Sequence, residues 1–165
     1  AALPGAAFFV FGGERSGLYG DVILNAWDAE DFDRDGASLA ADCNDADPTV
    51  RMVPSEVAGL AVTKAPGGTE LAWVPQASIA GPGTTYDLVS GWLSELRASR
   101  SYSGAYCLKN EQASAPYTDT HPAPPLGDGY YYLIRGGNVC GTSTYGSASY
   151  TPDPRDLLDA SGPCP

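Results

Sequence analysis

The segment Gly129-Tyr-Tyr-Tyr-Leu-Ile-Arg-Gly-Gly137 decides the fold that we expect for this chain. Aromatic and β-branched residues favour strands, and successive side chains of a strand point to opposite faces. Tyr130 and Tyr132 would then face a core and Tyr131 the solvent. Shorter runs of the same kind occur upstream, separated by Pro, Gly and Asn at the spacing of a β-sandwich. The sequence therefore predicts an all-β domain over residues 57–165.

Seven strands are expected in this domain. They span residues 57–64, 69–74, 85–93, 102–108, 116–118, 129–137 and 143–150. Alternation along these strands directs eight side chains toward the core, namely Leu60, Val62, Leu71, Trp73, Tyr86, Leu88, Tyr132 and Ile134. Residues 94–99 have room for one helical turn, which does not change the all-β class.

Three segments of this domain carry a resemblance to a known family. They are Leu71-Ala-Trp-Val-Pro75, Tyr86-Asp-Leu-Val-Ser-Gly91 and the stretch from Tyr131 to Gly141, and the closing Cys164-Pro165 matches as well. Together they resemble the fibronectin type III domain, in a variant common at the C-termini of secreted bacterial proteins. The resemblance covers roughly residues 57–165 and implies a fibronectin type III or immunoglobulin-like β-sandwich. It implies a fold and a location rather than a reaction.

An acidic segment, residues 28–56, precedes this domain. Three Asp residues alternate ahead of Gly36, and a fourth stands at position 12 of the same loop, which is the spacing of an EF-hand-type calcium loop. The expected ligands are Asp31, Asp33, Asp35, the carbonyl of Ala37, and Asp42. Position 12 is not the usual Glu, and no amphipathic helices flank the loop, so an EF-hand sensor is not expected. A solvated acidic loop is the alternative to a calcium site.

The next residues, Asp42-Cys-Asn-Asp-Ala-Asp-Pro48, resemble the Asp-rich DCxDxDP motif of secreted bacterial proteins, which is similar to thrombospondin type 3 calcium repeats. The resemblance implies a second ion, with Asn44, Asp45 or Asp47 among its ligands. Val53-Pro-Ser-Glu56 stands where that family has a Pro-Gly-Ala-x-Glu ending. The Gly of that ending is missing, and Glu56 is a candidate ligand by position only.

The four cysteines, Cys43, Cys107, Cys140 and Cys164, are too widely spaced for a zinc motif. Two disulfides in an oxidising, extracytoplasmic compartment are the better interpretation. Spacing alone allows three pairings. In a type III sandwich, the end of the strand at 129–137 and the chain that enters the first strand lie at the same end of the domain. The resemblance therefore favours Cys43–Cys140 with Cys107–Cys164, while Cys43–Cys107 with Cys140–Cys164 remains open.

Charge and composition restrict the partners of the chain. Its 165 residues carry a formal net charge of −11, which disfavours binding to nucleic acid or to an anionic membrane. No apolar run is long enough to cross a bilayer. The chain begins at Ala1 rather than Met, and we expect that a signal peptide has been removed. The Ser/Thr-rich stretch 142–149 has a composition that can carry O-linked glycans.

No catalytic motif stands out, and we do not expect an enzyme. The single histidine, His121, lies in a Pro-rich loop, and the chain has no Gly-x-Ser-x-Gly elbow for a nucleophile. The Gly pairs lack the Lys, Ser or following helix of a phosphate-binding loop.

Residues 1–27 form an extension with two short apolar runs, Ala6–Phe11 and Val22–Trp27. Such a run can add to the open edge of a β-sheet. If it adds to the next copy of the chain, head-to-tail repetition gives an extracellular fibre. The residues expected to be buried in that contact are Phe8, Phe9, Phe11, Val22, Leu24 and Trp27. The alternatives are a strand that folds back on its own domain and a monomeric calcium-binding spacer or binding module of a larger secreted enzyme or adhesin.

Overall fold

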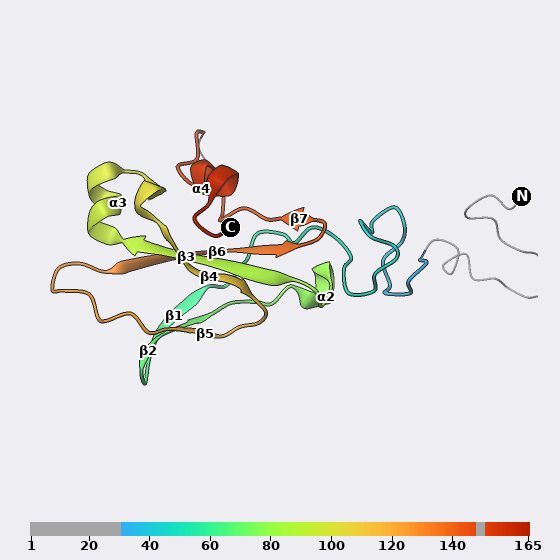
Figure 1. Cartoon of the computed structure of the whole chain (residues 1–165), viewed down its shortest axis with the longest axis horizontal. Helices are drawn as coiled ribbons and strands as arrows, with labels where there is room; N and C mark the ends of the chain where they lie inside the picture. Colours follow the sequence, from blue (N-terminus) through green and yellow to red (C-terminus); the bar gives the residue numbers. More distant parts are fainter. Residues whose placement is uncertain (1–30, 148–150) are drawn as a thin grey trace, which may run out of the picture.

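The computed structural model of the chain describes residues 31–147 and 151–165. These residues form two antiparallel β-sheets with few helices, so the all-β class is confirmed (Figure 1). The first sheet has the order β1 (Ala61–Ala65), β2 (Gly68–Ala72), β5 (Tyr117–Asp119). The second has the order β4 (Tyr106–Gln112), β3 (Thr85–Trp92), β6 (Tyr130–Asn138), β7 (Gly141–Thr142). The helical segments are α2 (Ala77–Ala80), α3 (Leu93–Ser99), the 3-10 turn at Tyr102–Gly104, and α4 (Asp156–Ser161).

The core lies between the two sheets. Its buried side chains come from both of them, namely Leu71, Trp73, Tyr86, Leu88 and Ile134. Trp73 and Tyr86 meet edge to face, with ring centroids 5.2 Å apart. All five were predicted inward positions. Fully burying an aliphatic side chain such as Leu71 or Leu88 contributes about 1.5–3 kcal/mol, so this cluster contributes substantially to the stability of the fold.

Val62 differs from its prediction, because its side chain is 51% exposed. It pairs directly with Leu71, which is only 1% exposed. Directly opposite residues of an antiparallel pair share a face, so Val62 does lie on the core face of its sheet. Because β1 is the edge strand of its sheet, Val62 lies at the margin of the core.

A second cluster covers the outer face of β3 and β6. Val89, Tyr145, Leu158 and Cys164 are buried there, and α4 supplies Leu158. The Arg135 guanidinium lies 4.8 Å from the centroid of the Tyr145 ring, a cation–π contact. This cluster holds the C-terminal segment against the outside of the second sheet.

The strand predicted at 143–150 is not formed over 143–147, and 148–150 lie outside the described residues. The main chain and hydroxyl of Ser143 still bond to Gly136. Two residues later Tyr145 enters the outer cluster, and its backbone N–H donates to Asp159 at 2.8 Å. The chain is thus drawn away from β6 after Ser143, and β7 stays short.

The three consecutive tyrosines of β6 are all half-buried. Tyr132 packs on the core, as predicted, whereas Tyr130 lies against Trp92 with ring centroids 4.4 Å apart. Tyr131 packs edge to face on Tyr102 rather than facing solvent freely. Burial raises the pKa of Tyr131 to about 12, with the neighbouring Tyr102 hydroxyl adding to the effect.

Candidate metal centre

The acidic loop folds so that alternate side chains point inward. Asp31, Asp33 and Asp35 are each partly buried, while the residues between them are exposed. Two positive φ angles, 64° at Arg34 and 95° at Gly36, produce the tight curvature. Only Gly adopts the second conformation without strain. The loop therefore directs its carboxylates toward a common interior.

Two groups of three carboxylates result. In each group one oxygen of every member lies within 4.8 Å of the others. The groups are Asp33, Asp35 and Asp42, and Asp31, Asp33 and Asp45. Asp33 belongs to both. Such spacing brings like charges together, which is unfavourable unless a cation lies among them.

Two carboxylate oxygens in this cluster are buried without a partner. They are Oδ2 of Asp33 and Oδ2 of Asp42, and Asp42 as a whole is only 9% exposed. A buried carboxylate oxygen without a hydrogen bond is costly, and such oxygens are expected where an ion binds. The donor set therefore fits a hard cation, which prefers oxygen ligands.

Hydrogen bonds fix the orientation of the remaining oxygens. The Asp35 backbone N–H donates to Oδ1 of both Asp31 and Asp33 at 3.1 Å. The Phe32 N–H donates to Asp45 Oδ1 at 2.8 Å, which joins the start of the loop to its second half. The other Asp42 oxygen accepts from the Asn44 N–H. The cluster is thus pre-organised by its own backbone.

The electrostatics of Asp33 follow from this crowding. Burial raises the pKa of Asp33, and the carboxylates of Asp35, Asp42 and Asp31 raise it further, against one hydrogen bond from the Asp35 backbone. A bound cation would reverse the sign of the local field and favour the ionised form.

Two of the predicted carboxylate ligands, Asp47 and Glu56, belong to neither group. Ala37, predicted to offer its carbonyl, is buried within the loop, and its N–H donates to Asp35. The Asn44 N–H donates to Oδ1 of Asp42. Asp47 instead caps a turn by accepting from both the backbone and the hydroxyl of Thr49. These two bonds lower the pKa of Asp47.

Glu56 lies outside the loop. Its carboxylate accepts a hydrogen bond from the Ser147 hydroxyl at 3.0 Å. That contact ties the chain entering the first sheet to the segment that follows β7.

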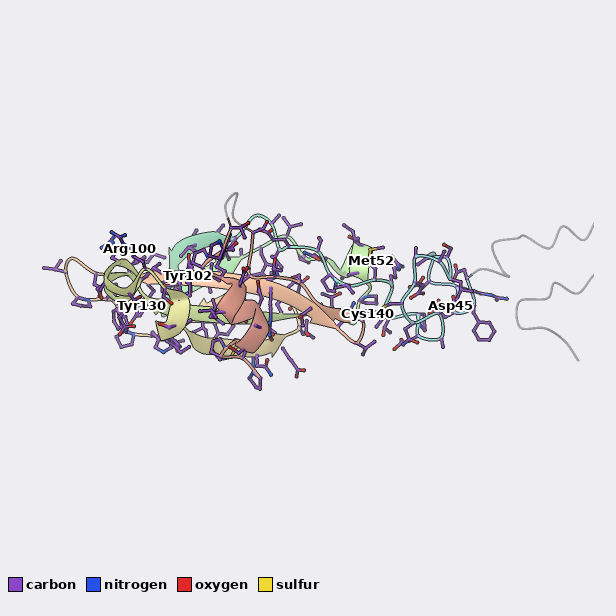
Figure 2. The ribbon with its side chains drawn as sticks, turned by 90° about the horizontal axis from the view of Figure 1, so that it is seen from above. Asp45, Met52, Arg100, Tyr102, Tyr130 and Cys140 are labelled. Atoms are coloured by element: carbon purple, nitrogen blue, oxygen red, sulfur yellow. A yellow bond between two sulfur atoms is a disulfide. The ribbon has the colours of Figure 1, made fainter. Side chains whose placement is uncertain are left out.

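Several contacts fasten the loop to the sheets. The disulfide Cys43–Cys140 joins it to the β6–β7 turn, with Cα atoms 5.8 Å apart, and Cys107–Cys164 joins β4 to the C-terminus. This is the pairing favoured by the resemblance. Arg51 bridges Asp35, at 3.1 Å, and the Ser78 carbonyl of α2. Figure 2 shows Asp45 at one end of the described residues, beyond Cys140.

The structure gives His121 a partner that sequence reasoning missed. Its ring Nδ1 lies 2.5 Å from Oδ1 of Asp119, which is only 2% exposed, and the Tyr132 hydroxyl donates to the other oxygen at 2.9 Å. Burial alone would raise the pKa of Asp119, but the bonds from His121 and Tyr132 outweigh it and lower that pKa. The signal was the Asp-x-His spacing. In the part of the chain described, no Ser, Thr or Cys bonds to the other ring nitrogen.

The residues predicted to form the polymer contact, from Phe8 to Trp27, lie outside the described residues. Within residues 31–147 and 151–165, no helix has the length and apolar character needed to cross a membrane.

Comparison with protein-family models, curated proteins and solved structures finds no match to this chain. Its function must therefore be argued from its own residues.

Proposed function

We propose that this chain is a structural subunit of an extracellular bacterial fibre, stabilised by calcium and assembled head-to-tail by donation of its N-terminal strand. The observation that carries the proposal is the open edge of β6. One side of this strand pairs with β3 from Tyr130 to Gly137. Along the other side, pairing among the described residues covers only Gly136 to Asn138. An exposed edge of this kind is a template for a strand from another chain.

The order of the strands supports a fibronectin type III domain. If the seven strands are lettered A, B, C, C′, E, F and G in chain order, the sheets β1-β2-β5 and β4-β3-β6-β7 become A-B-E and C′-C-F-G, which is the arrangement of a fibronectin type III domain. In that arrangement β7 occupies the place of the last strand. Because β7 has only two residues, the last strand is incomplete.

Calcium is the cation that the loop suits best. Every side-chain donor in the two groups is a carboxylate oxygen, whereas structural zinc prefers sulfur and nitrogen. Calcium accepts six to eight oxygens at flexible angles, so backbone carbonyls and water can complete the ligand sets. Ions at these positions would neutralise a cluster that otherwise repels itself.

The calcium loop gives the subunit a rigid pole. The Cys43–Cys140 bond and the Arg51 contacts attach the loop to the end of β6, and residue 31, where the described chain begins, is part of it. The N-terminal extension therefore leaves the subunit from this pole. Rigidity there would fix the direction in which the extension reaches the next subunit. The two disulfides suit an oxidising, extracellular setting.

The test is sedimentation velocity of the purified full chain over a range of concentrations, with calcium and with a chelator. A fibre subunit gives fast-sedimenting species that increase with concentration in calcium. A single monomeric species in both conditions, at every concentration, would contradict the fibre and leave a calcium-binding spacer or binding module.

A further inference from the structure

The direction of the backbone groups of β6 can be worked out from its hydrogen bonds. The Gly136 carbonyl accepts from the Ser143 N–H at 2.8 Å, and the Gly136 N–H donates to the Ser143 hydroxyl. The main-chain groups of Gly136 thus point away from β3. Backbone groups alternate in direction along a strand, so those of Ile134, Tyr132 and Tyr130 point the same way. In the described part of the chain they have no strand partner.

β1 is the edge strand of the other sheet. This strand pairs only with β2, so its other edge is open too. Val62 lies on the core face of β1, yet half of its side chain is exposed. A cavity of about 630 Å³ opens beside it, lined by β1, the β1–β2 hairpin and residues 120–124. The core face of β1 is therefore incompletely covered.

We propose that the segment Ala6–Phe11 of a second copy of this chain adds to the open edge of β6, pairing along Tyr130–Arg135 and covering Val62. We call this edge, together with the incompletely covered core face of β1, the acceptor groove. It rests on the proposed fibre function and adds to it the place of the contact and the identity of the donor. The inserted strand would complete the second sheet on the side where β7 ends.

The length and composition of the segment match the groove. Ala6–Phe11 has six residues, and so has the unpaired stretch Tyr130–Arg135. The segment has no charged side chain. Either alternate set, Ala6, Phe8 and Val10 or Ala7, Phe9 and Phe11, brings two large apolar side chains to the core face.

Reach also favours this segment over Val22–Trp27. Nineteen residues, 12–30, separate Phe11 from the acidic loop, enough to span up to about 60 Å when extended. Trp27 is only four positions from Asp31 and is confined to the neighbourhood of the loop.

The positions of the two ends favour a second copy as the acceptor. The acidic loop, where the described chain begins, lies beyond Cys140, whereas Tyr130 lies toward the opposite end of the molecule (Figure 2). A segment leaving the loop would have to reverse and run back along its own sheet to fill its own groove. The groove of the next subunit needs no reversal.

The experiment uses full-length chains with single substitutions. Val62→Asp places a charge in the groove, and Val74→Asp is the matched control, because Val74 is 59% exposed and does not line the cavity. Both variants should melt near the wild type. The sedimenting fraction of Val62→Asp should fall by more than about tenfold, because a strand that must bury an unpaired carboxylate binds far more weakly. Val74→Asp should assemble normally.

A mixing experiment keeps the test sound if Val62→Asp also weakens folding. Phe9→Asp disables the donor and leaves the groove intact, whereas Val62→Asp disables the groove and leaves the donor intact. Each variant alone should be monomeric, and an equimolar mixture should give a heterodimer and no longer species. Amide exchange supplies an independent readout. Tyr132 and Ile134 should be protected in the assembled wild type and exchange quickly in Val62→Asp.

The outcomes separate this inference from the function on which it rests. If the wild type and Val62→Asp assemble equally, the groove is wrong and the fibre stands. If the wild type is monomeric, the fibre itself is wrong, and so is the second copy. Protected Tyr132 and Ile134 amides in that monomer would show that the chain fills its own groove. Long fibres from the mixed variants would also overturn the proposal.

Discussion

Replacing Asp33 by Asn should destabilise the protein in calcium but not in chelator. Asp33 is the one carboxylate shared by both three-residue groups, and one of its oxygens is buried without a partner. In calcium, the substitution removes a ligand from both ions and destabilises the protein. In chelator, it removes one charge from a set of like charges and should leave the protein as stable as the wild type or more so.

The magnitude follows from binding linkage. At a calcium concentration about 100-fold above Kd, one ion adds about 2.7 kcal/mol to the free energy of unfolding and two independent ions add about 5 kcal/mol. For a chain of this size, each 1 kcal/mol shifts the Tm by about 2–4 °C. The wild type should therefore gain about 10–20 °C between chelator and calcium. The Asp33→Asn variant should gain less than half of that.

The assay is thermal unfolding followed by circular dichroism, with Asp47→Asn as the control. Asp47 is in the same loop, belongs to neither group, and as Asn still accepts hydrogen bonds from Thr49. The control should keep most of the calcium-dependent shift. Equal Tm values for the wild type in calcium and chelator would refute the site. A full calcium shift in Asp33→Asn would refute the role of the shared carboxylate.

Three further outcomes are expected. Because its pKa is lowered in the fold, Asp119 contributes stability above its unfolded pKa of about 3.9, and this stability is lost as the pH falls through the folded value. In chelator, the free energy of unfolding should therefore fall less steeply with decreasing pH for Asp119→Asn than for the wild type. Identical slopes would argue against this role of Asp119. Replacing Cys43 and Cys140 together by Ser should lower the free energy of unfolding by about 2–5 kcal/mol, because the disulfide closes a loop with a sequence separation of 97. The measurement is a denaturant titration, and an unchanged unfolding midpoint would contradict this prediction. Leu88→Ala should lower the free energy of unfolding by about 2–5 kcal/mol, because Leu88 is buried in the core and only 1% exposed. Val74→Ala, at a position that is 59% exposed, should lower it far less. Similar losses of stability in the two variants would contradict the assigned core.

The inward positions of the central strands were predictable because a strand has a period of two. Leu71, Tyr86, Leu88 and Ile134 alternate with less buried or outward-facing residues, and each lies in the core. Val62 obeys the same alternation, but it lies on the edge strand β1 at the margin of the core, and alternation does not reveal the order of strands in a sheet. The strand expected over 143–150 was likewise lost to a tertiary contact, since Tyr145 packs with α4 on the outer face.

At the candidate site, the sequence spacing located the carboxylates that converge. Asp31, Asp33, Asp35 and Asp42 come together because alternation and a Gly turn are local properties. Asp45 joins through a turn that only the family resemblance indicated. Asp47 and Glu56 make other hydrogen bonds, with Thr49 and Ser147, and spacing gave no sign of these competing partners. The contact between Asp119 and His121 depends on where β5 ends. The sequence placed that strand at 116–118, whereas β5 ends at Asp119.

Electron microscopy of the full chain, in calcium and after chelation, would show directly whether the chain polymerises. Filaments of uniform width are expected in calcium, with one subunit per axial repeat, and they should loosen or dissolve when calcium is removed. Isolated particles of single-subunit size in both conditions would contradict the proposed fibre.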